Sequence, residues 1–92
     1  MTERPVVVCT EYRGVFFGYA VDTSGERVTL SRARMCVYWS KALRGVLGLA
    51  SDGPNNECRI GKPVDGIELR GVTAVIECTE QAVTQWEKTP WL

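Results

Sequence analysis

The sequence predicts a single domain, residues 1–92, of mainly β structure (α+β). We expect a small antiparallel β-barrel or half-barrel of about five to seven short strands with one C-terminal helix. Short runs of β-branched and aromatic residues alternate with clusters of turn-forming residues, a pattern typical of such folds. The tripeptide Arg-Gly-Val occurs three times, at 13–15, 44–46 and 70–72, and each copy opens an apolar run. Apolar residues at helical spacing are convincing only near the C-terminus.

The first half of the chain is expected to hold four strands. Residues 5–10 are β-branched, and residues 15–21 would be apolar on both faces of an extended chain. A hairpin loop rich in turn formers follows at 22–26. Residues 27–31 and 35–39 then predict two strands separated by an irregular step, which a β-bulge or a barrel corner would produce. Residues 33, 37 and 40 could instead line a helix, but the β-rich composition favours the strand.

The second half of the chain is expected to be less regular. Residues 45–50 are apolar but interrupted by glycine, which predicts a tightly packed strand or a close approach of the backbone. A long loop region follows, with a short strand at 58–60. The last two strands, 67–69 and 74–76, repeat the earlier pattern of two strands around an irregular step, here at Arg70-Gly71.

The C-terminal segment carries the signals of a helix. Thr79 suits the N-cap position, where its hydroxyl can accept from a free backbone amide. Ala82, Val83 and Trp86 repeat at helical spacing, and Pro90 follows as a stop. The helix is too short to be stable alone in water. Its apolar face must therefore pack on the sheet or on a partner chain.

Composition limits the classes of partner. Eleven Lys and Arg residues balance eleven Asp and Glu residues, and a net charge of zero argues against nucleic acid as a partner. The same balance removes electrostatic repulsion between copies of the chain. Strands that are apolar on both faces add apolar surface, so we expect a homo-oligomer. The chain has no run of apolar residues long enough to span a membrane and no signal-peptide core at its start. We therefore expect no membrane contact and a cytoplasmic location.

No residue pattern predicts catalysis. The chain has no histidine, which excludes Ser-His, Cys-His and His-ligated metal chemistry. It also lacks the glycine motifs that cradle phosphates. Its four cysteines are scattered without a Cys-x-x-Cys pair, so reduced thiols are expected. We expect no catalytic residue, no cofactor and no metal site, and thus a protein that is not an enzyme.

Two clusters are candidates for binding. The first combines aromatic rings with cations just before a glycine-rich segment: Tyr38, Trp39, Lys41 and Arg44. A ring that stacks on a base beside cations that hold phosphates predicts a nucleotide-like small ligand. In the alternative reading, Trp39 belongs to the core and the two cations are solvated.

The second cluster is a candidate protein interface near the C-terminus. It consists of three apolar residues: Val83, Trp86 and Trp91. Large aromatic residues dominate the energetics of many interfaces. The alternative is a helix that folds onto its own core.

Four stretches resemble a family of small bacteriophage and prophage proteins of unassigned function: TEYRGVFFGY (10–19), SRARMCVYWS (31–40), RGVLGLA (44–50) and GVTAVIECT (71–79). The resemblance extends over nearly the whole chain. It implies a viral accessory protein that acts in the cytoplasm of a bacterial host. It supplies no catalytic residues.

Together these features lead us to expect a non-enzymatic phage accessory protein that binds and does not react. Such a protein could antagonise host antiviral defence by sequestering a nucleotide signal or by capping a host protein. The alternatives are a nucleic-acid-binding regulator and a virion or assembly component.

Overall fold

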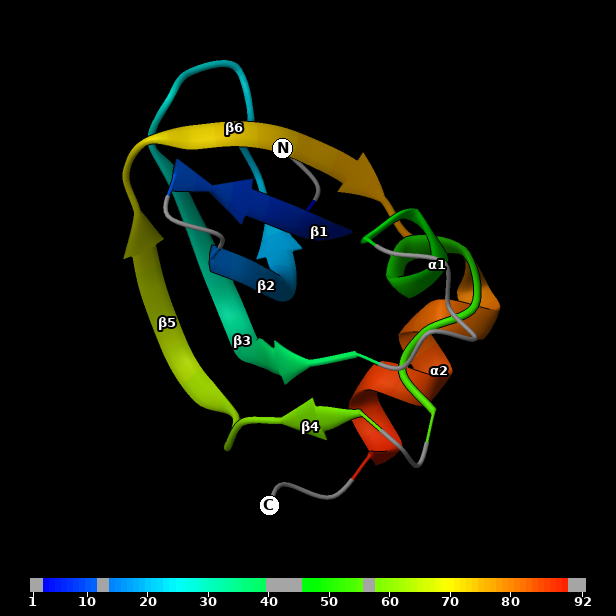
Figure 1. Ribbon diagram of the computed structural model, residues 1–92. Helices are drawn as coiled ribbons and strands as arrows, with labels where there is room; N and C mark the ends of the chain where they lie inside the picture. Colours follow the sequence, from blue (N-terminus) through cyan, green and yellow to red (C-terminus); the bar gives the residue numbers. More distant parts are fainter. Residues whose placement is uncertain (1–2, 12–13, 40–45, 56–57, 90–92) are drawn as a thin grey trace.

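The computed structural model describes residues 3–11, 14–39, 46–55 and 58–89 (Figure 1). These residues form six strands and two helices in the order β1 Arg4–Thr10, β2 Gly14–Ala20, β3 Val28–Tyr38, α1 Val46–Ser51, β4 Arg59–Ile60, β5 Val64–Leu69, β6 Val72–Glu77 and α2 Glu80–Lys88. The expectation of a mainly β domain with a C-terminal helix is confirmed. Among the described helices, none combines the length and the apolar composition needed to cross a bilayer.

All strand pairs are antiparallel, in the order β4-β3-β2-β1-β6, and β5 also pairs with β3. The consecutive strands β5 and β6 therefore lie at opposite sides of the sheet, joined by a sharp corner (Figure 1). Gly71 forms this corner with a φ of +70°, a conformation that a side chain would strain. Its carbonyl accepts from the Glu11 amide at 3.0 Å, which ties the corner to the end of β1. No ladder between the described residues of β5 and β6 closes the sheet, so it is a half-barrel.

The irregular step expected before residue 35 is a bulge inside β3, which runs as one strand of 11 residues. The pairing of β3 with β2 passes from Phe17 opposite Arg34 to Tyr19 opposite Ser31, so β3 carries one extra residue. Arg32 lies within this bulge, and its backbone φ is 48°. The bulge reverses which face each side chain meets. Arg34 consequently faces the helices.

The sheet is buried on both faces by one chain. One face packs against α1 and α2 through a helix-side core that includes Val7, Val15, Phe17, Leu49 and Trp86. The sheet is curved, and its other, concave face encloses a second core: Val6, Val8, Ala20, Val28, Leu30, Ala33 and Leu69. Much of the apolar surface that suggested self-association is thus buried within the chain, whereas Met35, Val37 and Val64 stay exposed. The homo-oligomer stays a prediction.

The prediction of a strand at residues 45–50 is wrong, because Val46–Ser51 forms the helix α1. Val46, Leu49 and Ala50 have the i, i+3, i+4 spacing of a helix face, and all three pack in the helix-side core. Gly48 is buried in the same helix, and its carbonyl accepts from the Asp52 amide at 2.8 Å. The glycines suggested a strand, but the apolar spacing decided the structure.

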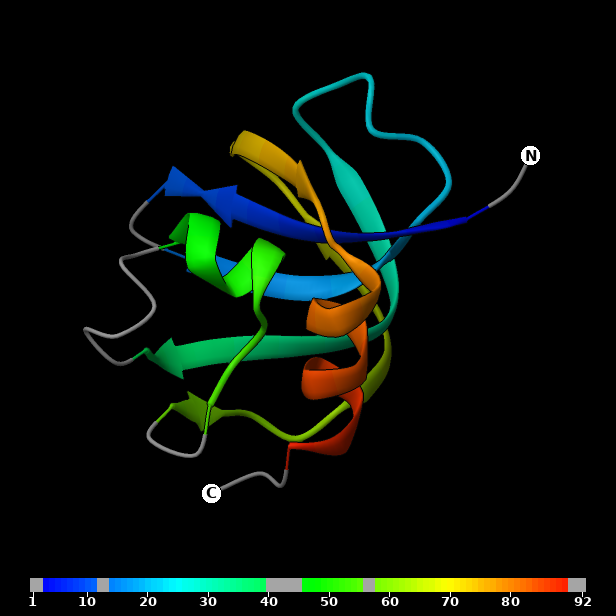
Figure 2. The ribbon, with the colours of Figure 1, turned by 90° about the vertical axis from the view of Figure 1, so that its right-hand side faces the viewer.

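The helix α2 begins as expected, with Thr79 as its N-cap. The Thr79 hydroxyl accepts from the Ala82 amide at 3.1 Å. The two helices lie side by side on one face of the sheet (Figure 2).

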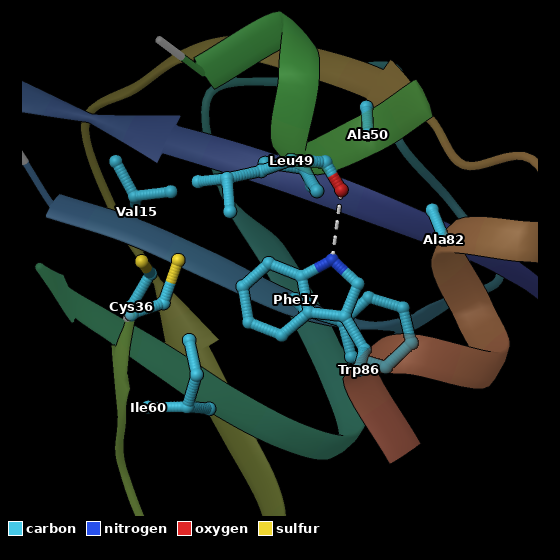
Figure 3. Close-up of a cluster of buried hydrophobic side chains, with 10 residues drawn as sticks. Val15, Phe17, Cys36, Leu49, Ala50, Ile60, Ala82 and Trp86 are labelled. Atoms are coloured by element: carbon cyan, nitrogen blue, oxygen red, sulfur yellow. Dashed lines mark hydrogen bonds between the residues drawn. The ribbon is translucent and has the colours of Figure 1, made fainter. Parts of the chain in front are cut away.

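Trp86 joins the sheet and both helices (Figure 3). Its ring stacks on Phe17 of β2, with ring centroids 5.0 Å apart and an interplanar angle of 7°. Its Nε1–H donates to the carbonyl of Leu49 in α1 at 2.9 Å. The side chain is 0% exposed. One buried indole therefore holds three elements together.

Replacing Trp86 by alanine should lower the free energy of unfolding by about 3–5 kcal/mol, because it removes the largest buried side chain and leaves a cavity. Trp86→Phe keeps a ring over Phe17 but leaves the Leu49 carbonyl without its donor, at a cost of about 1–3 kcal/mol. Urea unfolding followed by circular dichroism measures both. Gln81→Ala, an exposed change on the same helix, is the control and should shift stability little. Equal midpoints for Trp86→Ala and Gln81→Ala would contradict the assignment.

Candidate functional site

The structure describes two of the four residues predicted to bind a nucleotide. Tyr38 ends β3 and is 51% exposed. Trp39 is half-buried and packs against the helix-side core, as the alternative reading had it. Lys41 and Arg44 lie outside the described residues. The described part of this cluster thus consists of one core residue and one exposed ring.

One residue of the predicted C-terminal interface, Trp86, lies in the core instead. Trp86 has no exposed surface with which to contact a partner, so it is a core residue. The physical reason is its stacking on Phe17, which seals the indole beneath α2. Val83 is half-buried and packs against the same core. Trp91 lies outside the described residues.

A pocket between β3, the start of β5 and the end of α2 is the best-built candidate site. We call it the arginine pocket; its volume is about 320 Å³ and it is lined by Phe17, Arg32, Arg34, Pro63, Val64, Asp65 and Glu87. Two of these residues, Phe17 and Arg34, are nearly fully buried and form its floor. The other five are exposed and form its rim. A buried cation therefore lies under a ring of mixed charge.

Arg34 is clamped by backbone carbonyls. Its Nε donates to the Gly61 carbonyl at 2.9 Å, just before β5. Its Nη1 donates to the carbonyls of Trp86, at 2.8 Å, and of Thr89. The latter two carbonyls lie at the C-terminal end of α2, where the helix dipole favours a cation. The guanidinium is therefore held in one orientation by three carbonyls from two separate segments.

The third nitrogen of Arg34 is left without a partner. Nη2 is buried and makes no hydrogen bond to any residue that the structure describes. The side chain is only 5% exposed, and this burial lowers the pKa of Arg34 by disfavouring its charged form. A buried donor without an acceptor costs about 1–3 kcal/mol, so its retention calls for an explanation.

The rim is organised by a chain of polar contacts. The Arg32 guanidinium pairs with Glu3 at 2.5 Å and lies 4.0 Å above the ring of Tyr19. The Tyr19 hydroxyl donates to the Glu87 carboxylate at 2.7 Å. Burial, with the adjacent Glu87 carboxylate, raises the pKa of Tyr19 to about 12. The Asp65 carboxylate differs from these groups because it makes no hydrogen bond or ion pair with any described residue.

Residues 3–86 match the model of a family described as a domain of unknown function, DUF6948. The chain belongs to this family. No curated protein and no solved structure matches it.

The four cysteines of the DUF6948 chain are all free thiols. Cys36 and Cys58 are buried in the helix-side core, and Cys9 and Cys78 are half-buried beside it. Burial raises the pKa of Cys36 to about 12, with a smaller contribution from Cys58, and burial raises the pKa of Cys78 to about 12. In the described parts of the chain, no three Cys, Asp or Glu side chains come together as a metal site would require.

These shifts predict that the DUF6948 chain loses stability in alkali. The folded state keeps the thiol protons of Cys36 and Cys78, whereas the unfolded chain releases them above the ordinary pKa of 9.0. The free energy of unfolding should be at its full value below pH 9 and fall steadily as pH rises toward 12. Urea unfolding at a series of pH values measures this slope, which Cys36→Ala should reduce. A stability that stays level up to pH 11 would contradict the burial of these thiols.

Proposed function

We propose that this DUF6948 chain is a non-enzymatic binding protein that holds a small molecule with an acidic group in the arginine pocket. One observation carries the proposal: the Nη2 nitrogen of Arg34 is a buried cationic donor with no acceptor among the described residues. An acidic ligand would supply the missing acceptor. The cost of the unsatisfied donor in the empty protein would then be recovered on binding.

The pocket suits binding because its central cation is already oriented. Arg34 is fixed through Nε and Nη1, so no side-chain freedom is lost when Nη2 meets a ligand oxygen. Arginine presents a planar fork that matches carboxylate and phosphate groups. Nη2 is covered in the unliganded protein, so a ligand reaches it when neighbouring atoms of the pocket lining move aside.

The shape of the pocket limits the ligand to a small molecule. Its volume of about 320 Å³ lies at the lower end of the range of roughly 300–1,000 Å³ that is usual for ligand pockets. Phe17, Pro63 and Val64 provide apolar wall, which favours a ligand with an apolar body beside its acidic group.

Binding without catalysis is supported by the residues at hand. The chain has no histidine, the usual general base at neutral pH. The buried thiol of Cys36, whose pKa is about 12, is protonated and thus a poor nucleophile at neutral pH. Of the two rim carboxylates, Glu87 already accepts a hydrogen bond from Tyr19.

The resemblance to phage proteins suggests a biological setting for such a binder. We propose that the protein acts as an accessory factor in the cytoplasm of a bacterial host, where it withdraws a small acidic signal molecule from a defence pathway. The site for this ligand is the arginine pocket rather than the segment from Tyr38 to Arg44.

The proposal is tested by filling the pocket. Val64 is on the rim and 45% exposed, so Val64→Trp should block the pocket without disturbing the core. The matched control is Leu47→Trp, which adds the same ring at an exposed position on α1, away from the pocket. The probes are inorganic phosphate, adenosine monophosphate and 4-methylpentanoate, titrated against the labelled protein and followed by amide shifts in nuclear magnetic resonance spectra.

We expect at least one probe to bind the wild-type chain and to shift the amides of Val64 and Asp65. Val64→Trp should weaken that binding by at least about tenfold, because the added ring occupies the ligand volume. Leu47→Trp should leave it unchanged. Absence of binding by these probes and by every standard amino acid at about 10 mM, a concentration that detects affinities weaker than 1 mM, or equal loss in both variants, would refute the proposal.

A further inference from the structure

The charges that line the arginine pocket are balanced. Arg32 and Arg34 contribute two cations, and Asp65 and Glu87 contribute two carboxylates. Arg34 lies on the buried floor, whereas both carboxylates and Arg32 lie on the exposed rim. A ligand that reaches the floor therefore meets a lone cation there and groups of both signs at the mouth.

Two of these four groups are already paired at the rim. Arg32 pairs with Glu3, and Glu87 accepts from Tyr19. The other two have no partner among the described residues: Nη2 of Arg34 is buried without an acceptor, and the Asp65 carboxylate is exposed to solvent without a protein donor. The residues that line the pocket thus include one covered donor on the floor and one exposed acceptor on the rim.

This pair of unmet groups discriminates between classes of acid. A nucleotide or an inorganic phosphate would satisfy Nη2 of Arg34 but would bring further negative charge into a pocket that Asp65 and Glu87 also line, and like charges repel. A simple carboxylic acid would satisfy Arg34 and leave Asp65 unpaired. A molecule with one carboxylate and one ammonium group satisfies both.

We infer that the arginine pocket takes a small zwitterion of the α-amino acid type. This inference rests on the proposed function, since it names the class of ligand for the same site. The ligand carboxylate accepts from Nη2 of Arg34 on the floor, and its ammonium group donates to Asp65 at the rim. Its side chain lies against the apolar wall of Phe17, Pro63 and Val64, which favours an aliphatic side chain.

A matched series of probes tests the inference. L-Leucine carries both charged groups on an isobutyl side chain. 4-Methylpentanoate carries the carboxylate alone, and 3-methylbutylamine carries the amine alone. Each is titrated against the full chain by nuclear magnetic resonance, together with adenosine monophosphate, and the other standard amino acids are screened beside L-leucine.

The expected result is that an aliphatic amino acid binds at least about tenfold more tightly than either half-probe, because each charged contact is worth on the order of 1.4 kcal/mol or more. Asp65→Asn should remove most of that advantage while it leaves the affinity for 4-methylpentanoate unchanged. Asp52→Asn, which neutralises an exposed carboxylate that does not line the pocket, should change neither.

The outcomes separate the inference from the proposed function. If 4-methylpentanoate or adenosine monophosphate binds as tightly as every amino acid, the zwitterion inference is wrong and the acidic-ligand proposal stands. If Asp65→Asn leaves amino-acid binding intact, the inference is also wrong. If neither the acids nor the amino acids bind, both the inference and the proposed function fail.

Discussion

The stacking of Trp86 on Phe17 is the contact on which the rest of this structure depends. It fixes α2 on the sheet, and the indole N–H draws in α1 through the Leu49 carbonyl. The same residues shape the candidate site, because Phe17 forms part of the pocket floor and the Trp86 carbonyl holds Arg34. A small domain has little core to spare. Here one cluster of contacts serves both stability and the pocket.

Arg34 illustrates how a charge is retained inside so small a protein. Burial of a lone guanidinium is costly unless its hydrogen bonds are met. Carbonyls at the C-terminal end of α2 meet several of them, and the helix dipole there favours a cation. The bond to Gly61 adds the turn before β5. The remaining nitrogen, Nη2, has no acceptor among the described residues. This free donor distinguishes a candidate binding site from an arginine with a purely structural role.

The sequence predicted those parts of the fold that are encoded locally. The β-branched run of β1 and the Thr79 cap both depend on residues close together in the chain. The helix α1 was missed because its glycines resemble a strand signal while its apolar spacing is only one turn long. The pocket could not be predicted, because the face that Arg34 occupies depends on a bulge whose register is set by pairing with β2. The three carbonyls that hold Arg34 come from segments far away in sequence.

The indole of Trp86 is buried and hydrogen-bonded where the sheet meets the two helices, and the rest of the fold depends on this. Hydrogen exchange of the indole N–H groups, read in a nitrogen-proton correlation spectrum, tests this most directly. The chain has three tryptophans, and Trp86→Phe assigns the signal of interest. We predict that the Trp86 indole exchanges as slowly as the most protected backbone amides of β1 and β2, through global unfolding. Exchange within minutes at neutral pH, while those amides stay protected, would contradict the account.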